Sequence, residues 1–199
     1  MKTTLSVVFA VAIMLNNTAD AADRSATGSE WFFRPYVGAD YEYSALNYRH
    51  GEEAKFADYL NGGDVHIGVR VHKHLGFEAS YIDAARSRTV NGLGNGINDD
   101  VSVSGFALDA MAYLPVDQAA RYELIGTVGV SQLTGSTYVS GLVVLSQFQS
   151  ETRGRVGVGA QYWLTDNLNV RGLLRYQKSS FGDSINDIII AGVGVNWQF

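Results

Sequence analysis

The sequence predicts an all-β protein, an eight-stranded antiparallel up-and-down β-barrel, and three observations support this. Apolar residues alternate with polar or small residues over eight segments, which is the period of a strand with two different faces. The connections between these segments alternate between long and short. The composition includes 22 Gly, 11 Tyr and 9 Phe but only 2 Pro, which suits many strands joined by turns.

The first residues of the chain predict a cleavable signal peptide and export through the Sec pathway. Lys2 precedes an apolar stretch, residues 5–15, and the small residues Ala19 and Ala21 follow it. The apolar stretch is too short to cross a bilayer as a helix. We expect cleavage after Ala21, with Ala22 as the alternative, and a buried N-terminal helix is the competing interpretation.

Eight strands are expected after this segment, and their connections fall into two groups. The predicted strands are 33–45, 65–72, 75–82, 105–114, 122–131, 155–164, 168–177 and 188–199. The long connections are 46–64, 83–104, 132–154 and 178–187, and the short ones are 73–74, 115–121 and 165–167. Long loops therefore gather at one end of the barrel and tight turns at the other, as in transmembrane barrels.

Within these strands, one face is apolar and the opposite face carries every charge. The charged residues on that face are Arg34, Asp40, Glu42, Arg70, Glu78, Asp109, Glu123, Arg155, Arg171 and Arg175, five acids and five bases. If the apolar face meets lipid, these residues lie inside the barrel and pair with one another. An eight-stranded barrel is filled by its own side chains, so we expect a plugged polar lumen and not an open pore.

A soluble barrel with its apolar face turned inward is the alternative, and the aromatic residues argue against it. They fall at two levels of the apolar face, as in the two interfacial girdles of a membrane barrel. The level near the turns holds Phe33, Phe77, Tyr122, Tyr162, Trp197 and Phe199, and the level near the loops holds Tyr41, Tyr43, Tyr81, Phe106 and Tyr176. The lysines after the signal peptide, Lys55, Lys73 and Lys178, all lie in connections, where water is expected.

Several segments resemble a known family. Residues 36–39, 76–81 and 157–168, together with the Trp197-Gln198-Phe199 ending, are similar to the OmpA/OmpX-type outer-membrane barrels. The resemblance implies a multi-pass protein of the outer membrane of a Gram-negative bacterium, surrounded by lipid and lipopolysaccharide. It also implies that Trp197 and Phe199 are read by the barrel-assembly machinery. The implied organisation is a signal peptide (1–21), an N-terminal periplasmic segment (22–32) and the barrel (33–199).

Composition and motifs narrow the function classes. The net charge of −5 argues against a nucleic-acid partner, and without cysteine there is no thiolate metal site or Cys nucleophile. We expect no cofactor and no metal, because His72 and His74 share a face but lack a third ligand nearby. We expect no enzyme activity, since none of the four histidines lies in a motif of the lipid A-modifying barrels. Such an enzyme and a narrow ion or small-solute channel are kept as alternatives.

The resemblance implies a structural or surface-interaction role, adhesin-like or immune-evasion-like, through the long loops. Loop 132–154 is unusually apolar, and large exposed apolar patches often mark interaction sites. Its candidate contact residues are Tyr138, Leu142, Val143, Val144, Leu145 and Phe148. One interpretation is a contact with a host or neighbouring protein. The other is that the flanking strands continue above the membrane as a hairpin.

Overall fold

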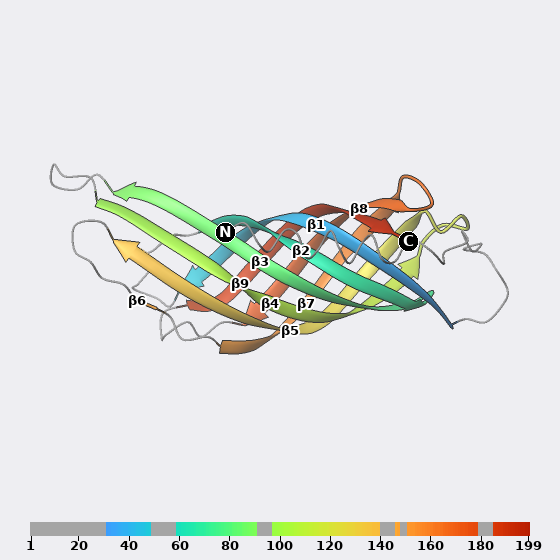
Figure 1. Ribbon diagram of the computed structural model, residues 1–199, viewed down its shortest axis with the longest axis horizontal. Helices are drawn as coiled ribbons and strands as arrows, with labels where there is room; N and C mark the ends of the chain where they lie inside the picture. The colour runs from blue at the N-terminus through green and yellow to red at the C-terminus, as the bar shows by residue number, and fades with distance from the viewer. Residues whose placement is uncertain (1–30, 49–58, 91–96, 140–145, 148–150, 179–184) are drawn as a thin grey trace.

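The computed structural model describes residues 31–48, 59–90, 97–139, 146–147, 151–178 and 185–199. They form eight long antiparallel strands that close into a barrel, with one two-residue strand attached at one end (Figure 1). The strands are β1 (Trp31–Tyr48), β2 (Tyr59–His72), β3 (Leu75–Val90), β4 (Ile97–Pro115), β5 (Tyr122–Val139), β6 (Ser146–Gln147), β7 (Glu151–Trp163), β8 (Leu168–Lys178) and β9 (Ile185–Gln198). In the part of the chain that is described, no helix has the length and apolar composition needed to cross a bilayer.

The barrel closes because the last strand pairs with the first. β9 runs antiparallel to β1, from Tyr36 opposite Gln198 to Asn47 opposite Asp187. Every other long strand pairs with its neighbours in chain order, and β4 pairs with β5 to complete the ring. The predicted fold class, an eight-stranded antiparallel up-and-down barrel, is therefore confirmed for the described residues.

The predicted strand ends were wrong at the loop end of the barrel. β2 begins at Tyr59, six residues before the predicted start, and β3 ends at Val90 instead of residue 82. β4, β5, β7 and β9 are longer there in the same way. Gly62 and Gly63 look like turn residues, yet they pair on both sides because β1 and β3 continue past them. Of the predicted N-terminal segment, Trp31 and Phe32 belong to β1, and residues 1–30 lie outside the described residues.

At the turn end the predicted boundaries differ from the observed ones by few residues. Pro115 extends β4, while Leu164 lies beyond the end of β7 and Phe199 beyond the end of β9. The turn between β2 and β3, residues 73–74, lies where it was predicted.

Three adjacent strands reach farther than the others at the loop end (Figure 1). The last pair between β2 and β3 is Asn61 with Ala85, but β3 stays paired with β4 as far as Val90. On the other side, the last pair between β5 and β7 is Leu133 with Glu151, and β5 continues to Val139 against β4. We call residues 86–90, 97–101 and 134–139 the projecting sheet. Its five β3 residues add about 17 Å of strand.

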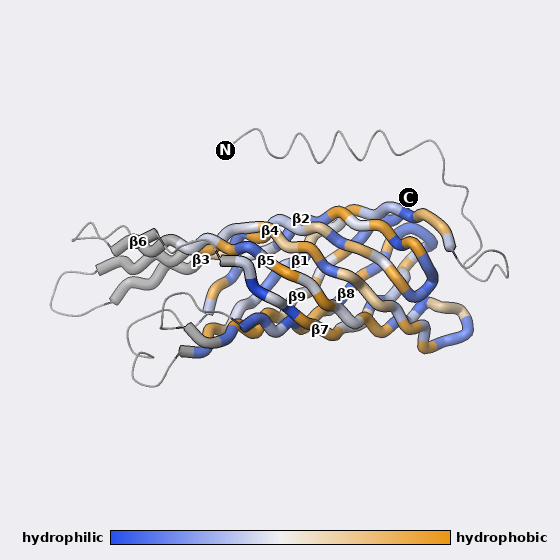
Figure 2. The backbone as a smooth tube through the Cα atoms, turned by 90° about the horizontal axis from the view of Figure 1, so that it is seen from below, coloured by the Kyte–Doolittle hydropathy of each residue, from blue (hydrophilic) through white to orange (hydrophobic). Residues whose placement is uncertain are grey.

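Hydrophilic and hydrophobic residues alternate along the strands (Figure 2), and the two faces of the wall differ in polarity. Outward-facing residues are apolar and exposed, for example Leu108, Val158 and Val193, each more than 60% exposed. The inward face of the same strands carries buried polar and charged residues, for example Asp109 and Arg155. This is the reverse of a soluble barrel, whose apolar residues point inward.

Small residues give the large inward side chains their space. A Cβ atom on Gly68 would collide with the ring of Tyr36, and one on Gly38 would collide with His66 and Asn196. Glycine at these two positions therefore leaves room for the Tyr36 ring and the His66 imidazole inside the narrow lumen.

Candidate functional site

The charged face predicted from the alternation lies inside the barrel. Nine of its ten residues are buried, and Arg34 is partly exposed near the turn end. Asp64 and His66 are buried beside them. The described lumen thus holds six buried carboxylates, including Asp64, against the four buried guanidinium groups of Arg70, Arg155, Arg171 and Arg175. The expected balance of five acids and five bases is replaced by an excess of acids.

Arg171 on β8 is the centre of the main cluster. Its Nε donates to Asp40 Oδ1 at 2.9 Å and its Nη2 donates to Asp40 Oδ2 at 2.7 Å. On the other side, Nη1 donates to Glu78 Oε2 at 2.6 Å and Nη2 to Glu78 Oε1 at 3.0 Å. One guanidinium therefore joins β8 to β1 and, across the lumen, to β3. Such bidentate pairs are strong and strongly directional.

Arg175 forms the next layer toward the loops. Its Nη1 donates to Glu42 Oε1 at 2.8 Å and lies 3.5 Å from Asp64 Oδ2. Its Nη2 lies 3.5 Å from Glu78 Oε1, which links this layer to that of Arg171. The two arginines therefore share one group of acids.

Two further ion pairs lie outside this cluster, one between β7 and β4 and one near the turn end. Arg155 on β7 binds both carboxylate oxygens of Asp109, and its Nη2 donates to Ser80 Oγ at 3.4 Å. Near the turn end, Arg70 donates to Glu123 with Nη1 at 3.0 Å and Nη2 at 2.6 Å. Its guanidinium also lies over the ring of Tyr113, 4.4 Å from the ring centre.

The carboxylate of Glu123 is held by neutral groups as well. The indole Nε1 of Trp163 donates to Glu123 Oε2 at 3.0 Å, and the amide of Gln161 donates to the same oxygen. A cavity of about 10 Å³ lies beside this group, between Arg70, Tyr36 and Asn196. A space of that size holds about one water molecule, so it is no passage for solutes.

His66 was considered in the sequence only as a possible catalytic group, and the structure places it in the main cluster. Its Nδ1 lies 2.7 Å from Asp64 Oδ1 and its Nε2 lies 2.6 Å from Asn196 Oδ1. Since Asn196 belongs to β9, His66 ties β2 to the last strand inside the lumen.

Asp40, Asp64 and His66 form a geometric candidate for a metal site. Their ligand atoms lie within 4.8 Å of one another, and all three residues are buried. The position next to them is taken by Arg171 Nη2, which lies 2.7 Å from Asp40 Oδ2 and 3.2 Å from His66 Nδ1. The guanidinium already supplies the positive charge that a metal ion would bring.

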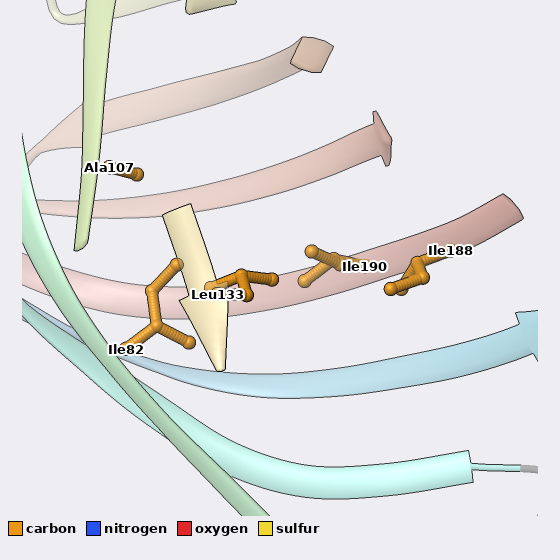
Figure 3. Close-up of a cluster of buried hydrophobic side chains, with 5 residues drawn as sticks. All are labelled: Ile82, Ala107, Leu133, Ile188 and Ile190. Carbon is orange, nitrogen blue, oxygen red and sulfur yellow. The ribbon is translucent and has the colours of Figure 1, made fainter. Parts of the chain in front are cut away.

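The loop end of the lumen is apolar, which the sequence analysis did not predict. Ile82, Ala107, Leu133, Ile188 and Ile190 form a buried cluster there (Figure 3). Leu46 and Val103 pack against it. We call this cluster the apolar layer. It comes from β3, β4, β5 and β9, and Ile190 pairs with Arg175 across the β8–β9 ladder. The lumen is therefore filled by aliphatic side chains toward the loops. Farther toward the turns it holds the charged pairs together with a second buried cluster, formed by Met111, Tyr113, Ile125 and Leu173.

The predicted girdle residues all belong to the outward face. Nine of them are exposed, and Tyr162 and Phe199 are partly exposed. Tyr122 and Tyr162 pack together with ring centres 4.5 Å apart, as do Tyr81 and Phe106 at 5.2 Å.

The predicted contact residues of loop 132–154 fall mostly outside the described residues. This applies to Leu142, Val143, Val144, Leu145 and Phe148, and only the backbone of Tyr138 is described. In the described part, Ser136 pairs with Gln147 and Thr137 with Ser146. Beyond Leu133, where its pairing with β7 ends, β5 is therefore paired with β4 and with the two residues of β6.

The histidines of the β2–β3 turn have structural partners. The backbone N–H of His74 donates to His72 Nδ1 at 3.1 Å, and His74 Nδ1 donates to the carbonyl of Tyr113 at 2.8 Å. Because Nδ1 of each ring is used in this way, the two rings are arranged to hold the turn against β4.

Comparison with known proteins agrees with this architecture. Residues 7–199 match the sequence profile of the outer membrane protein beta-barrel domain. No curated protein matches the chain by sequence. Among solved structures, Ail, the attachment invasion locus protein of Yersinia pestis, aligns with a TM-score of 0.60 and 15% identity over 84% of this chain and 99% of Ail.

Two further solved structures align over a similar length. Neisserial surface protein A gives a TM-score of 0.57 and 15% identity, over 84% of this chain and 97% of that protein. The outer membrane protein OprG of Pseudomonas aeruginosa gives a TM-score of 0.60 and 11% identity, over 86% of this chain and 98% of OprG. At these identities the likeness concerns the fold.

Proposed function

Because the chain belongs to the outer membrane protein beta-barrel domain family, we propose that it is a non-conducting outer-membrane anchor that makes contacts outside the cell. Its location is the outer membrane of a Gram-negative bacterium, where lipid covers the apolar wall. The proposal places the long connections outside the cell and the short turns in the periplasm, the usual arrangement in such barrels.

The projecting sheet is the observation that carries this proposal. A membrane anchor needs no strands beyond the lipid. Yet β3, β4 and β5 remain paired with one another well past the points where β2 stops pairing with β3 and β7 stops pairing with β5. Backbone that is already ordered loses little conformational entropy on binding. A rigid platform of this kind therefore suits contact with another molecule.

The filled lumen supports the non-conducting part of the proposal. Arg171 and Arg175 bridge the middle of the lumen, and the apolar layer closes its loop end. An ion passing through would have to displace both the ion pairs and the aliphatic side chains.

The name of one structural neighbour points the same way. Ail is the attachment invasion locus protein and was solved with a heparin analogue. We extend only the general role, attachment at the surface, to this chain. The apolar residues Tyr138, Leu142, Val143, Val144, Leu145 and Phe148 are proposed to take part. Surrounding lipopolysaccharide and recognition of Trp197 and Phe199 by the assembly machinery belong to the same proposal.

Deletion of residues 137–148 tests the role. We expect cells that display this variant to lose adhesion to host cells, or the variant to lose its association with a partner protein. Shortening of loop 179–184 is the matched control, since it removes extracellular chain outside the projecting sheet. Heat-modifiable gel migration verifies that both variants are folded. Undiminished adhesion and unchanged oligomer size would contradict the proposal.

Two measurements address the other function classes. Single-channel recording in planar bilayers should give no large, stable openings, and such openings would favour the narrow channel. Incubation of the purified protein with lipid A should leave its acyl chains unchanged, and loss or transfer of an acyl chain would favour the enzyme.

A further inference from the structure

The barrel is closed by the pairing of β1 with β9, which we call the seam. In the described part of the chain, every other pair of adjacent long strands consists of consecutive strands, whereas the seam joins the first strand to the last. In a hairpin the turn fixes the register of the two strands, but β1 and β9 are not joined by a turn. The register of the seam therefore depends on contacts of the strands themselves.

The apolar outer face of β9 does not fix this register. Its outward residues are Ile189, Ala191, Val193, Val195 and Trp197. Because side chains alternate with a period of two, a shift of two residues would again turn apolar residues toward the lipid. The register of a glycine-rich strand is weakly specified by its pattern, and β9 contains Gly192 and Gly194. The inward residues of the seam must therefore determine the register.

One inward contact crosses β1. Gly38 of β1 is paired with Asn196 of β9 on one side and with His66 of β2 on the other. His66 Nε2 lies 2.6 Å from Asn196 Oδ1, and a Cβ atom on Gly38 would collide with both side chains. On β8, Asn169 Oδ1 accepts a hydrogen bond of 3.0 Å from Asn196 Nδ2. The contact therefore joins β9 to β2 over a residue that has no side chain.

A second inward contact crosses β9 in the same way. Gly194 of β9 is paired with Arg171 of β8 on one side and with Asp40 of β1 on the other. The guanidinium of Arg171 binds the carboxylate of Asp40 with Nε at 2.9 Å and Nη2 at 2.7 Å. A Cβ atom on Gly194 would collide with that carboxylate and with the carbonyl oxygen of Ala39. Each strand of the seam thus has a glycine that is crossed by a contact between its two neighbouring strands.

We propose that Gly38 and Gly194 fix the register in which the barrel closes, because each lets a buried polar contact cross one strand of the seam. A shift of two residues would place Asn196 opposite Asp40 or Tyr36. The side chains at those positions would block the path that Gly38 leaves open. The same shift would remove Gly194 from its place between the two members of the ion pair. Buried polar groups that lose their partners are costly, so both contacts favour the observed register.

Disulfide formation between introduced cysteines tests the register. The chain contains no cysteine, and Ala39 lies opposite Val195 on the outer side of the seam. Cysteines at directly opposite positions are close enough to be bridged, whereas cysteines two residues out of register are not. In the folded full-length protein in lipid vesicles, Ala39→Cys should therefore crosslink with Val195→Cys. Val193→Cys and Trp197→Cys report the two shifted registers and should give no crosslink with Ala39→Cys.

Alanine at two glycines of β9 separates the register effect from a general loss of stability. Gly194→Ala should lower the yield of the native crosslink several-fold, because its Cβ atom takes space that the Asp40 carboxylate occupies. Gly192→Ala is the matched control on the same inward face and should leave the yield unchanged. An added Cβ atom there would lie 3.5 Å from Glu42 Cγ, an ordinary contact. Equal yields for the two variants would overturn the proposal, and so would efficient crosslinking of Val193→Cys without either substitution.

Asn196→Ala tests the first contact without adding volume. Because it removes the contact with His66, exchange of backbone amide hydrogens in β1 and β9 should become about tenfold faster, while exchange between β3 and β4 stays the same. Gln161→Ala is the control, since this buried amide bonds Glu123 between β7 and β5, away from the seam. Heat-modifiable migration verifies folding of each variant. Equal acceleration in β3 and β4, or an equal effect of Gln161→Ala on the seam, would contradict the proposal.

Discussion

In the middle of the lumen, Arg171 bonds Asp40 and Glu78, whereas at the loop end Leu133 and Ile190 pack in an aliphatic cluster. Both regions are buried, but they depend on different physics. A buried ion pair requires each specific partner, because a lone charge left in the lumen is very unfavourable. An aliphatic cluster requires volume and tolerates changes that conserve it. The stability of the charged middle should therefore depend on which charged groups are present, and the contribution of the apolar layer should depend on side-chain volume.

The largest effect is expected from Arg171→Met. The substitution leaves Asp40 and Glu78 without their bidentate partner, and we expect a loss of about 3–5 kcal/mol in the free energy of unfolding. Urea titration of the protein folded in lipid vesicles measures it. Arg121→Met, at an exposed turn position, is the control and should change stability by about 0.5 kcal/mol or less. If the two variants lose the same amount, the charged middle does not stabilise the barrel.

The next effect concerns the apolar layer. Leu133 is 4% exposed, and Leu133→Ala should cost about 2–5 kcal/mol because it leaves a cavity between β4, β5 and β9. Leu124→Ala is the control on the same strand. Leu124 faces outward and is 50% exposed, so lipid fills the space that the substitution creates and the loss should be smaller. Equal losses in the same urea titration would argue against a packed loop end.

A smaller effect is expected from a neutral hydrogen bond at the level of the apolar layer, where Ser131 pairs with Ala107 and Gln177 with Ile188. Ser131 Oγ donates to Gln177 Oε1 at 2.8 Å, and both residues are buried. Ser131→Ala should cost about 1 kcal/mol. Thr152→Ala, at an exposed position of β7, should be close to neutral. If Ser131→Ala lowered the free energy of unfolding more than Leu133→Ala does, a neutral hydrogen bond would matter more to stability here than side-chain volume.

The smallest effect is expected when both members of an ion pair are replaced. Arg155→Met and Asp109→Leu should each destabilise the barrel, but the double variant should lie within about 1 kcal/mol of the wild type. The coupling energy from this double-mutant cycle measures the pair itself. A double variant as unstable as the sum of its parents would mean that Asp109 and Arg155 act independently.

Alternation along the chain was sufficient to predict the fold class and the inward position of the charges. It could not predict the partners, because these depend on how far each strand is shifted against the next around the ring. Arg171 meets Glu78 across the lumen, 93 residues away in the chain. The alternation within one strand gives no information about which residue of a distant strand lies opposite.

The strand ends and the apolar layer were missed for related reasons. Residues 59–64 include Asn61, Gly62 and Gly63, which are typical of loops, so Asp64 was placed outside the barrel. Its position next to His66 shows that strand pairing overrides local preference when both neighbouring strands continue. Ile82, Ile188 and Ile190 occupy the inward face at the loop end, where the inward residues are apolar instead of polar. This change lies so close to the predicted strand ends that too few residues remain to form a recognisable pattern.

The span of the central ion pairs has a consequence for how the protein is made. Arg171 joins residues from β1 and β3 to β8, and the pair with Asp40 closes a loop of 131 residues. Long-range contacts of this kind form late, because the chain must first lose the entropy of a large loop. Until β8 arrives, Asp40 and Glu78 have no guanidinium beside them. An incompletely inserted barrel would then carry bare charges at membrane depth, so closure of the wall and neutralisation of the interior should occur as one cooperative step.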